Sequence, residues 1–164
     1  MNAIIRAVDA SIDSSDEKYF HAARRDIESE FASLYTAAGF GIPEPPASEY
    51  NHGERSGNVG VIRIEGPITP RASWFTEASG LTSVDGVSAD LDAMAADPSI
   101  SRVVFVFDSP GGAVTGVSEL AAQIRDYPKP TSAYVYGMAA SAAYWIASAA
   151  DQIVAANTAD VGSI

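Results

Sequence analysis

The chain has 164 residues, of which 47% are hydrophobic and 19% are charged, and its formal net charge is -11. This composition is typical of one globular domain with an extension and excludes a disordered or fibrous protein. The acidic balance argues against a general nucleic-acid-binding surface, because neutralising phosphates requires clustered lysine and arginine. With no cysteine there are no disulfides or thiolate metal sites, and the two histidines form no ligand-like cluster, so we expect no metal and no cofactor.

The first predicted element is an amphipathic helix within an N-terminal arm, residues 1–38. Ser14 stands three residues before Glu17, the spacing of a capping box, and apolar residues then recur at helical spacing, as in a packing face: Phe20, Ala23, Ile27, Phe31 and Leu34. Residues 39–57, rich in proline and glycine, predict a linker. No stretch has the pattern of a signal peptide or the length of a membrane span, so we expect a cytoplasmic protein.

Residues 58–164 show the alternation of strands and helices that is typical of an α/β domain with a mostly parallel sheet. The alternating residues 58–68 predict a strand. An irregular loop is expected over 69–86. A helix then ends before Pro98, and its apolar face is formed by Val87, Leu91 and Met94.

A second strand and a glycine-rich turn follow. The continuous apolar run over 103–107 is of the kind seen in strands buried on both faces, and it leads into Ser109, Pro110, Gly111 and Gly112. Because glycine has no side chain, the amides of Gly111 and Gly112 can approach a substrate closely and point at a developing negative oxygen, as an oxyanion hole requires. A glycine pair after a strand is, taken alone, more often a simple turn.

Ser141 is the candidate nucleophile. A helix over 117–127 and a strand over 131–136 lead to it, and this strand-helix-strand unit is right-handed by default, so the glycine turn and Ser141 are expected at the same end of a parallel sheet. The N-terminus of the helix that follows favours negative charge beside the serine. Taken alone, a serine at the start of an alanine-rich helix is more often an N-cap.

The helix after Ser141 is apolar nearly all round, which predicts that it is buried, with Tyr144 and Trp145 in the core first and in contact with substrate second. A short strand is expected over 151–155, and another begins near Asp160.

In this order and spacing, the Ser-Pro-Gly-Gly turn and the Gly-x-Ala-Ala-Ser motif from Gly137 to Ser141 resemble the serine peptidases of the signal peptide peptidase A type, family S49. Within that family the resemblance is to the phage capsid-maturation proteases. It covers roughly residues 58–164 and implies a Clp/crotonase-like fold with a repeated ββα or βαβ core. The site that it implies has Ser141 as nucleophile, Gly111 and Gly112 as the oxyanion hole, and Ser109 and Pro110 as the supporting loop.

One feature departs from the resembled family, whose serine is activated by a lysine base in an apolar pocket, several tens of residues further along. This chain contains only Lys18, in the arm, and Lys129, expected at the opposite end of the sheet. His21 and His52 are alternative bases, but both are expected in surface or local roles. We therefore expect a peptidase domain truncated at its C-terminus, inside a strand, which lacks its general base.

The resemblance implies a serine endopeptidase that cleaves peptide bonds through an acyl-enzyme on Ser141. Its substrates would be scaffold and capsid proteins in phage head maturation, or peptides of the signal-peptide type. It also implies a homo-oligomer in the host cytoplasm or the phage prohead, with no nucleic acid or membrane span involved. Two alternatives remain: a catalytically inactive assembly or scaffold subunit, which the missing base favours, and a crotonase-like acyl-CoA enzyme, which the placement of Ser141 disfavours.

Overall fold

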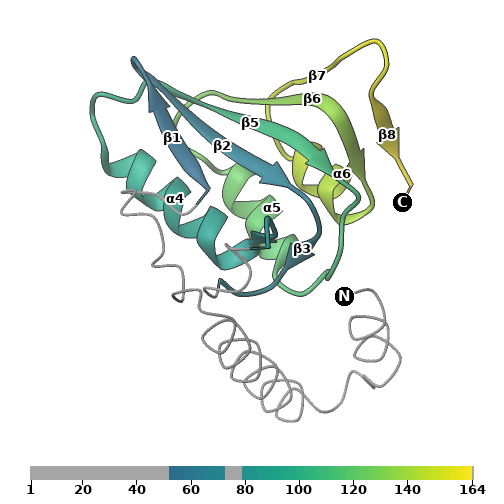
Figure 1. Ribbon diagram of the computed structural model, residues 1–164. Coiled ribbons are helices and arrows are strands. Elements are labelled where there is room, and N and C mark those ends of the chain that lie inside the picture. The colour runs from purple at the N-terminus through teal and green to yellow at the C-terminus, as the bar shows by residue number, and fades with distance from the viewer. Residues whose placement is uncertain (1–51, 73–78, 164) are drawn as a thin grey trace, which may run out of the picture. The chain divides into compact units, whose positions relative to one another are not determined.

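The computed structural model describes residues 52–72 and 79–163 (Figure 1). The chain divides into two units, Met1–Glu44 and Pro45–Ile164, and all of the described residues belong to the second. Several predictions lie outside the described residues: the helix of the arm, most of the linker, Lys18 and His21. Within the described ranges, no helix is long and apolar enough to cross a membrane.

A six-stranded sheet forms the centre of the second unit (Figure 1). The strand order is β1-β2-β5-β6-β7, and β8 pairs with β6. Only β1 runs antiparallel to its neighbour within this sheet of the described chain. The bounds are β1 Gly53–Ser56, β2 Val59–Glu65, β5 Arg102–Ser109, β6 Thr131–Ala140, β7 Ile153–Ala155 and β8 Asp160–Gly162. The predicted α/β class with a mostly parallel sheet is confirmed.

Two very short strands, β3 (Ile68–Thr69) and β4 (Thr82–Ser83), form a separate parallel pair. This pair was not predicted: Ile68 is the last residue of the strand expected over 58–68, and Thr69 and β4 lie in the stretch 69–86 that was expected to be a loop. Their importance is positional. Ile68 forms an isolated bridge with Gly112, so this small sheet holds the glycine turn that follows β5.

Three helices, α4 (Val84–Ala96), α5 (Val117–Arg125) and α6 (Ala142–Ala147), pack on one face of the large sheet. Alternate residues of the central strands face them and are buried, because the side chains of a strand point to opposite faces in turn. This core includes Ile62, Ile64, Phe105, Phe107 and Val135 from the strands, and Leu91, Met94, Leu120, Ile124 and Ile146 from the helices.

The other face of the sheet is only partly covered in the described part of the chain. Val104 and Val106 are half-buried and Tyr134 is exposed, whereas Phe105 between the two valines is buried. The run in β5 had predicted burial on both faces, and here that prediction is wrong: within the described residues, the helices cover one face alone.

Two strands differ from their predicted extents. β1 lies inside the segment predicted as a linker, because its polar residues carry no alternation and its strand conformation comes from backbone pairing with β2. β6 continues past Tyr136 to Ala140, through a bulge in which the single residue Asp108 faces the three residues 136–138. The bulge carries the end of β6 to the candidate nucleophile.

Candidate active site

Ser141 is the only residue between β6 and α6. Its backbone lies at φ 54° and ψ -123°, a conformation that L residues rarely adopt. Two hydrogen bonds hold it there: its N–H donates to Gly162 O of β8 at 2.9 Å, and its carbonyl accepts from Trp145 N at 3.1 Å. Non-glycine residues in such conformations cost about 1–3 kcal/mol and cluster at functional sites. A sharp strand-to-helix turn of this kind exposes a serine hydroxyl, as in nucleophile elbows.

The hydroxyl of Ser141 does not cap α6. The residue occupies the N-cap position, yet its side chain makes no capping hydrogen bond. It is exposed, and among the described residues its Oγ has no hydrogen-bond partner. The simpler role weighed from the sequence, an N-cap, is therefore not what this side chain does in the structure.

The glycine turn is attached to the start of β3 by backbone hydrogen bonds. Gly66 N donates to Asp108 O at 3.0 Å, Ile68 N donates to Gly111 O at 2.9 Å, and Ala113 N donates to Ile68 O at 3.0 Å. These bonds fix the path of the chain through the turn.

The structure brings this turn against Ser141. A Cβ atom placed on Gly111 would lie 2.9 Å from Ser141 Cβ and 3.0 Å from Ala142 N, closer than real Cβ contacts. On Gly112 it would lie 2.7 Å from Ile68 N and closer still to Ile68 O. Gly111 also has φ 88°. Both positions therefore require glycine, one to approach the serine and the other to pass the backbone of β3.

The two predicted oxyanion amides differ in their hydrogen bonding. The N–H of Gly111 donates to Ser109 Oγ at 3.1 Å, whereas that of Gly112 has no partner within the described residues. Ala142 N begins α6, where the first N–H groups of a helix have no intrahelical acceptor. The Ala142 amide was missed from the sequence, although its place directly after the candidate nucleophile was a usable signal.

The two supporting residues of the turn have different environments. Ser109 is fully buried, and its Oγ donates to Gly66 O at 2.6 Å. Pro110 is exposed, and because proline has no N–H it does not compete for Ser109 Oγ.

The candidate bases inside the described residues have other contacts. Lys129, just before the N-terminal end of β6, donates from Nζ to Met94 O and Asp97 O, each at 2.6 Å. His52 Nε2 accepts from Ser83 N at 3.1 Å and lies 2.9 Å from Ser83 Oγ. Lys129 is thus committed to the C-terminal end of α4 and His52 to the N-terminal end, while Ser141 follows the last residue of β6.

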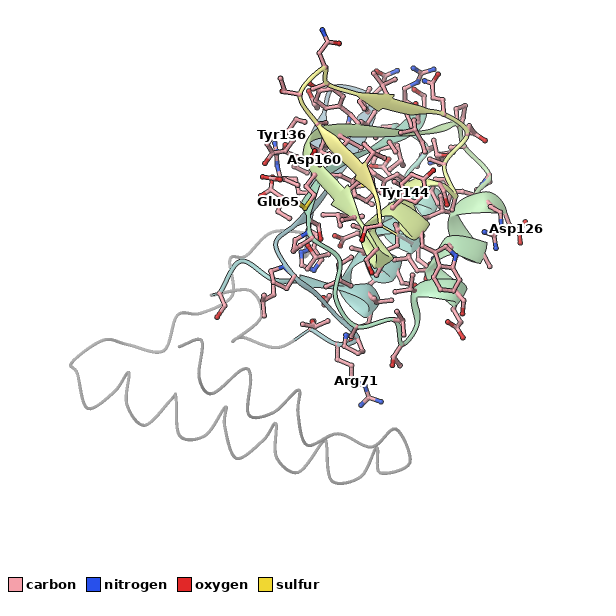
Figure 2. All side chains as sticks on the ribbon, turned by 90° about the vertical axis from the view of Figure 1, so that its right-hand side faces the viewer. Glu65, Arg71, Asp126, Tyr136, Tyr144 and Asp160 are labelled. Carbon is pink, nitrogen blue, oxygen red and sulfur yellow. The ribbon has the colours of Figure 1, made fainter. Side chains whose placement is uncertain are left out.

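A polar cluster lies on the open face of the sheet near the carboxyl ends of the strands. Figure 2 shows Tyr136 and Glu65 close together, on the side away from Asp126 at the end of α5, and Tyr136 Oη donates to Glu65 Oε1 at 3.2 Å. Partial burial, together with the carboxylates of Glu65 and Asp108, raises the pKa of Tyr136 above its ordinary value.

Trp145 corrects one expectation. It is 43% exposed, and Tyr144 is half-buried, so neither belongs to a buried core as predicted. The reason is that α6 is short and packs through one face, formed by Ala142, Ala143, Ile146 and Ala147. Trp145 follows Ser141 by four residues, donates its N–H to the Ser141 carbonyl, and is exposed like Ser141.

Comparisons with known proteins support the family. Residues 123–164 match the model of peptidase family S49. The capsid assembly protease C of Escherichia phage lambda is 31% identical over 135 residues, which are 80% of this chain and 30% of that protein. The head-tail preconnector protein GP5 of Enterobacteria phage P21 is 32% identical over 108 residues, 65% of this chain and 22% of that protein. The chain thus spans less than a third of either relative.

A solved structure supports the fold. The enoyl-CoA hydratase of a Polaromonas species aligns with a TM-score of 0.52 at 24% identity, over 65% of this chain and 48% of that one. The predicted Clp/crotonase-like class is therefore confirmed. Together these matches show that the chain is similar to peptidase family S49 over residues 123–164 and to two phage proteins along most of its length, as its motifs indicated.

Proposed function

We propose that the chain carries the nucleophile and the oxyanion hole of a serine endopeptidase. Ser141 Oγ attacks the scissile carbonyl carbon, its proton passes to a general base and then to the leaving amine, and water later hydrolyses the acyl-enzyme. The observation that carries the proposal is the strained, exposed Ser141, whose hydroxyl does not cap α6 and whose Cβ lies against Gly111.

Two backbone amides are suited to stabilise the oxyanion. Gly112 N–H has no partner within the described residues, and Ala142 N–H stands at the start of α6 beside Gly111. Donors of this kind act where charge develops in the transition state, and removing one costs about 100- to 1000-fold in rate. We infer that Gly112 and Ala142 donate to the same oxygen, so that Gly111 contributes its lack of a side chain and not its N–H.

The general base would come from outside the described residues. Lys129 and His52 are hydrogen-bonded to the two ends of α4, so we do not assign either as the base. A lysine supplied by further sequence of the whole protein would complete the site, which accords with the small share of each relative that this chain spans.

The phage relatives suggest the substrates. Scaffold and capsid proteins would be cut during head maturation, in the phage prohead or the host cytoplasm, by a homo-oligomer of the protein. Peptides of the signal-peptide type are the second candidate substrate. An extended peptide would run along the turn past Gly112, where backbone hydrogen bonds give affinity.

A fluorophosphonate probe tests the nucleophile. The full chain is incubated with the probe, and the labelled residue is identified by mass spectrometry. We expect slow labelling of Ser141 that is lost in Ser141→Ala. The matched control is Ser148→Ala, because Ser148 is another exposed serine at the end of the same helix, with its Oγ bonded to Trp145 O. Labelling of Ser148 in place of Ser141, or of both equally, contradicts the proposal.

The same experiment separates the alternatives. Failure of the wild-type chain to react, together with failure of the whole native protein, favours an inactive assembly subunit. Binding of an acyl-CoA without labelling favours a crotonase-like enzyme. The intact mass of the native protein, set against the 17.1 kDa of this chain, shows whether it carries a further segment with a lysine.

A further inference from the structure

Ser109 joins three pieces of chain through one hydroxyl. It is the last residue of β5 and is fully buried. Its Oγ donates to Gly66 O, in the turn between β2 and β3, at 2.6 Å, and accepts from Gly111 N at 3.1 Å. A backbone N–H can only donate and a carbonyl can only accept, so the direction of both bonds is determined. The hydroxyl therefore has no freedom to reverse.

This arrangement selects between the two amides of the turn. Gly111 and Gly112 are neighbours, and either N–H could in principle face a substrate. The N–H of Gly111 donates to Ser109 Oγ, and the carbonyl of Gly111 accepts a hydrogen bond from Ile68 N at 2.9 Å. With both polar groups of the Gly111 backbone bonded, the peptide plane before it and the one after it are held, and the Gly112 amide is left unpaired among the described residues.

We propose that Ser109 is a positioning residue: by bonding the Gly111 amide, it makes Gly112 the one amide of the turn that is free to serve Ser141. That the Gly112 amide assists catalysis by Ser141 rests on the proposed function. That Ser109 leaves the Gly112 amide, and not the Gly111 amide, without a hydrogen-bond partner among the described residues does not. Ser109 touches neither the substrate nor the reacting atoms in this account.

Amide hydrogen exchange by NMR on the full chain tests the choice of amide. In the wild type we expect Gly111 to be protected and Gly112 to exchange quickly. In Ser109→Ala the Gly111 amide loses its acceptor, and its exchange should accelerate about five- to tenfold, the factor that corresponds to one lost hydrogen bond. Unchanged protection of Gly111 in Ser109→Ala would overturn the proposal.

The matched control is Thr131→Val. Thr131 is also buried, and its hydroxyl also takes part in two hydrogen bonds, both with Asp151, but it lies at the opposite end of β6 from Ser141. This variant measures what the loss of a buried hydroxyl does to overall stability. It should leave the ratio of exchange rates at Gly111 and Gly112 unchanged.

Labelling of Ser141 by the fluorophosphonate tests the consequence for chemistry. We expect Ser109→Ala to react about tenfold more slowly than Thr131→Val, because a displaced oxyanion donor weakens transition-state stabilisation. Ser109→Thr, which keeps the hydroxyl, should label Ser141 faster than Ser109→Ala does.

The outcomes separate the two proposals. Equal labelling rates in Ser109→Ala and Thr131→Val would reduce Ser109 to a residue that only stabilises the fold. If the wild type is not labelled at all, the proposed peptidase chemistry fails, and the exchange rates still decide whether Ser109 selects the free amide.

Discussion

Gly112 and Gly137 each leave no room for a Cβ atom, but their neighbours differ. At Gly112 the obstacle is the backbone of Ile68, which is held by its bonds to Gly111 and Ala113. At Gly137 it is the carboxylate of Asp108, an exposed side chain that is able to rotate away. Replacing the first glycine therefore has to move backbone, whereas replacing the second moves a side chain.

We expect Gly112→Ala to lower the free energy of unfolding by about 1–3 kcal/mol and to abolish labelling of Ser141, since the glycine turn, which we propose holds the oxyanion, must shift. Gly137→Ala should cost less than about 1 kcal/mol and leave labelling in place. Urea unfolding and probe labelling of both variants check this. Equal losses in the two variants would show that the Ile68 backbone is not the obstacle.

The sequence was enough to predict that Gly111 and Ser141 lie close together, because each follows a parallel strand and such strands end at one edge of a sheet. It was not enough to choose between the amides of Gly111 and Gly112. That choice depends on Ser109 Oγ and on its second bond to Gly66, a residue 43 positions away. A contact between residues so far apart in the chain cannot be predicted from a local sequence pattern.

The C-terminal end of α4 is capped from outside the helix. Lys129 Nζ donates to Met94 O and Asp97 O, and carbonyls at this end of a helix otherwise lack partners and carry partial negative charge. Lys129 therefore ties the segment before β6 to α4. Lys129, which the sequence already placed at the opposite end of the sheet from the candidate nucleophile, thus has a structural role.

Lys129→Met keeps the length of the side chain and removes its charge and donors. We expect the free energy of unfolding to fall by about 1–2 kcal/mol, measured by urea denaturation, with the rate of Ser141 labelling unchanged. Lys129→Arg, which keeps the charge, should lose less. A labelling rate that collapses in Lys129→Met while the fold stays intact would make Lys129 the general base and contradict our assignment.

The turn after α4 should make stability depend on pH. The hydroxyl and backbone N–H of Ser99 both donate to Asp97 and lower the pKa of its carboxyl from 3.8, with smaller contributions from Arg55 and Lys129. A lowered pKa means that the ionised carboxyl stabilises the fold above pH 3.8 and that this contribution is lost as pH falls through the lower, folded value.

Urea midpoints of the wild type and Asp97→Asn, measured from pH 7 down to pH 2, test this. We expect the wild type to be more stable at pH 7 and the difference to shrink below about pH 4. A difference that stays constant over the whole range would mean that Asp97 acts through its shape and not through its charge.

Elements with a strong apolar period were predicted well, and those made by tertiary contacts were not. The central strands and α5 follow from alternation and from a helical stripe. β1 has no alternation, and β3 and β4 have two residues each; their strand conformation comes from pairing alone. The exposure of Trp145 was missed because the apolar composition of α6 does not show that the helix packs against the rest of the domain through one face alone.

Among the described residues the large sheet is mostly parallel and has its helices on one face, and parallel sheets are normally covered on both. One edge is protected from further pairing by charge: β1 carries Glu54 and Arg55. The opposite edge is apolar, since all three residues of β7 are exposed and Val154 is 51% exposed. Val154 also lies beside Tyr134 in the register of the sheet. Within the described residues, the edge of the sheet that carries no protecting charge is therefore the one formed by β7.

We expect this side to drive association of the chain with itself at high concentration, and Val154→Lys to reduce it, because a charge on an edge strand opposes pairing. Sedimentation velocity over a range of concentrations measures the effect. The matched control is Val114→Lys, which adds the same charge at an exposed valine away from the sheet. Equal reductions in both variants would point to net charge and not to the β7 edge.

The backbone of Ser141 has a further consequence. At φ 54° and ψ -123° an L side chain raises the energy of the fold, whereas glycine would adopt the same angles with little strain. Selection for stability alone would therefore drive this position toward glycine. Among descendants that kept the fold but gave up its chemistry, serine should be one of the first residues of the site to disappear.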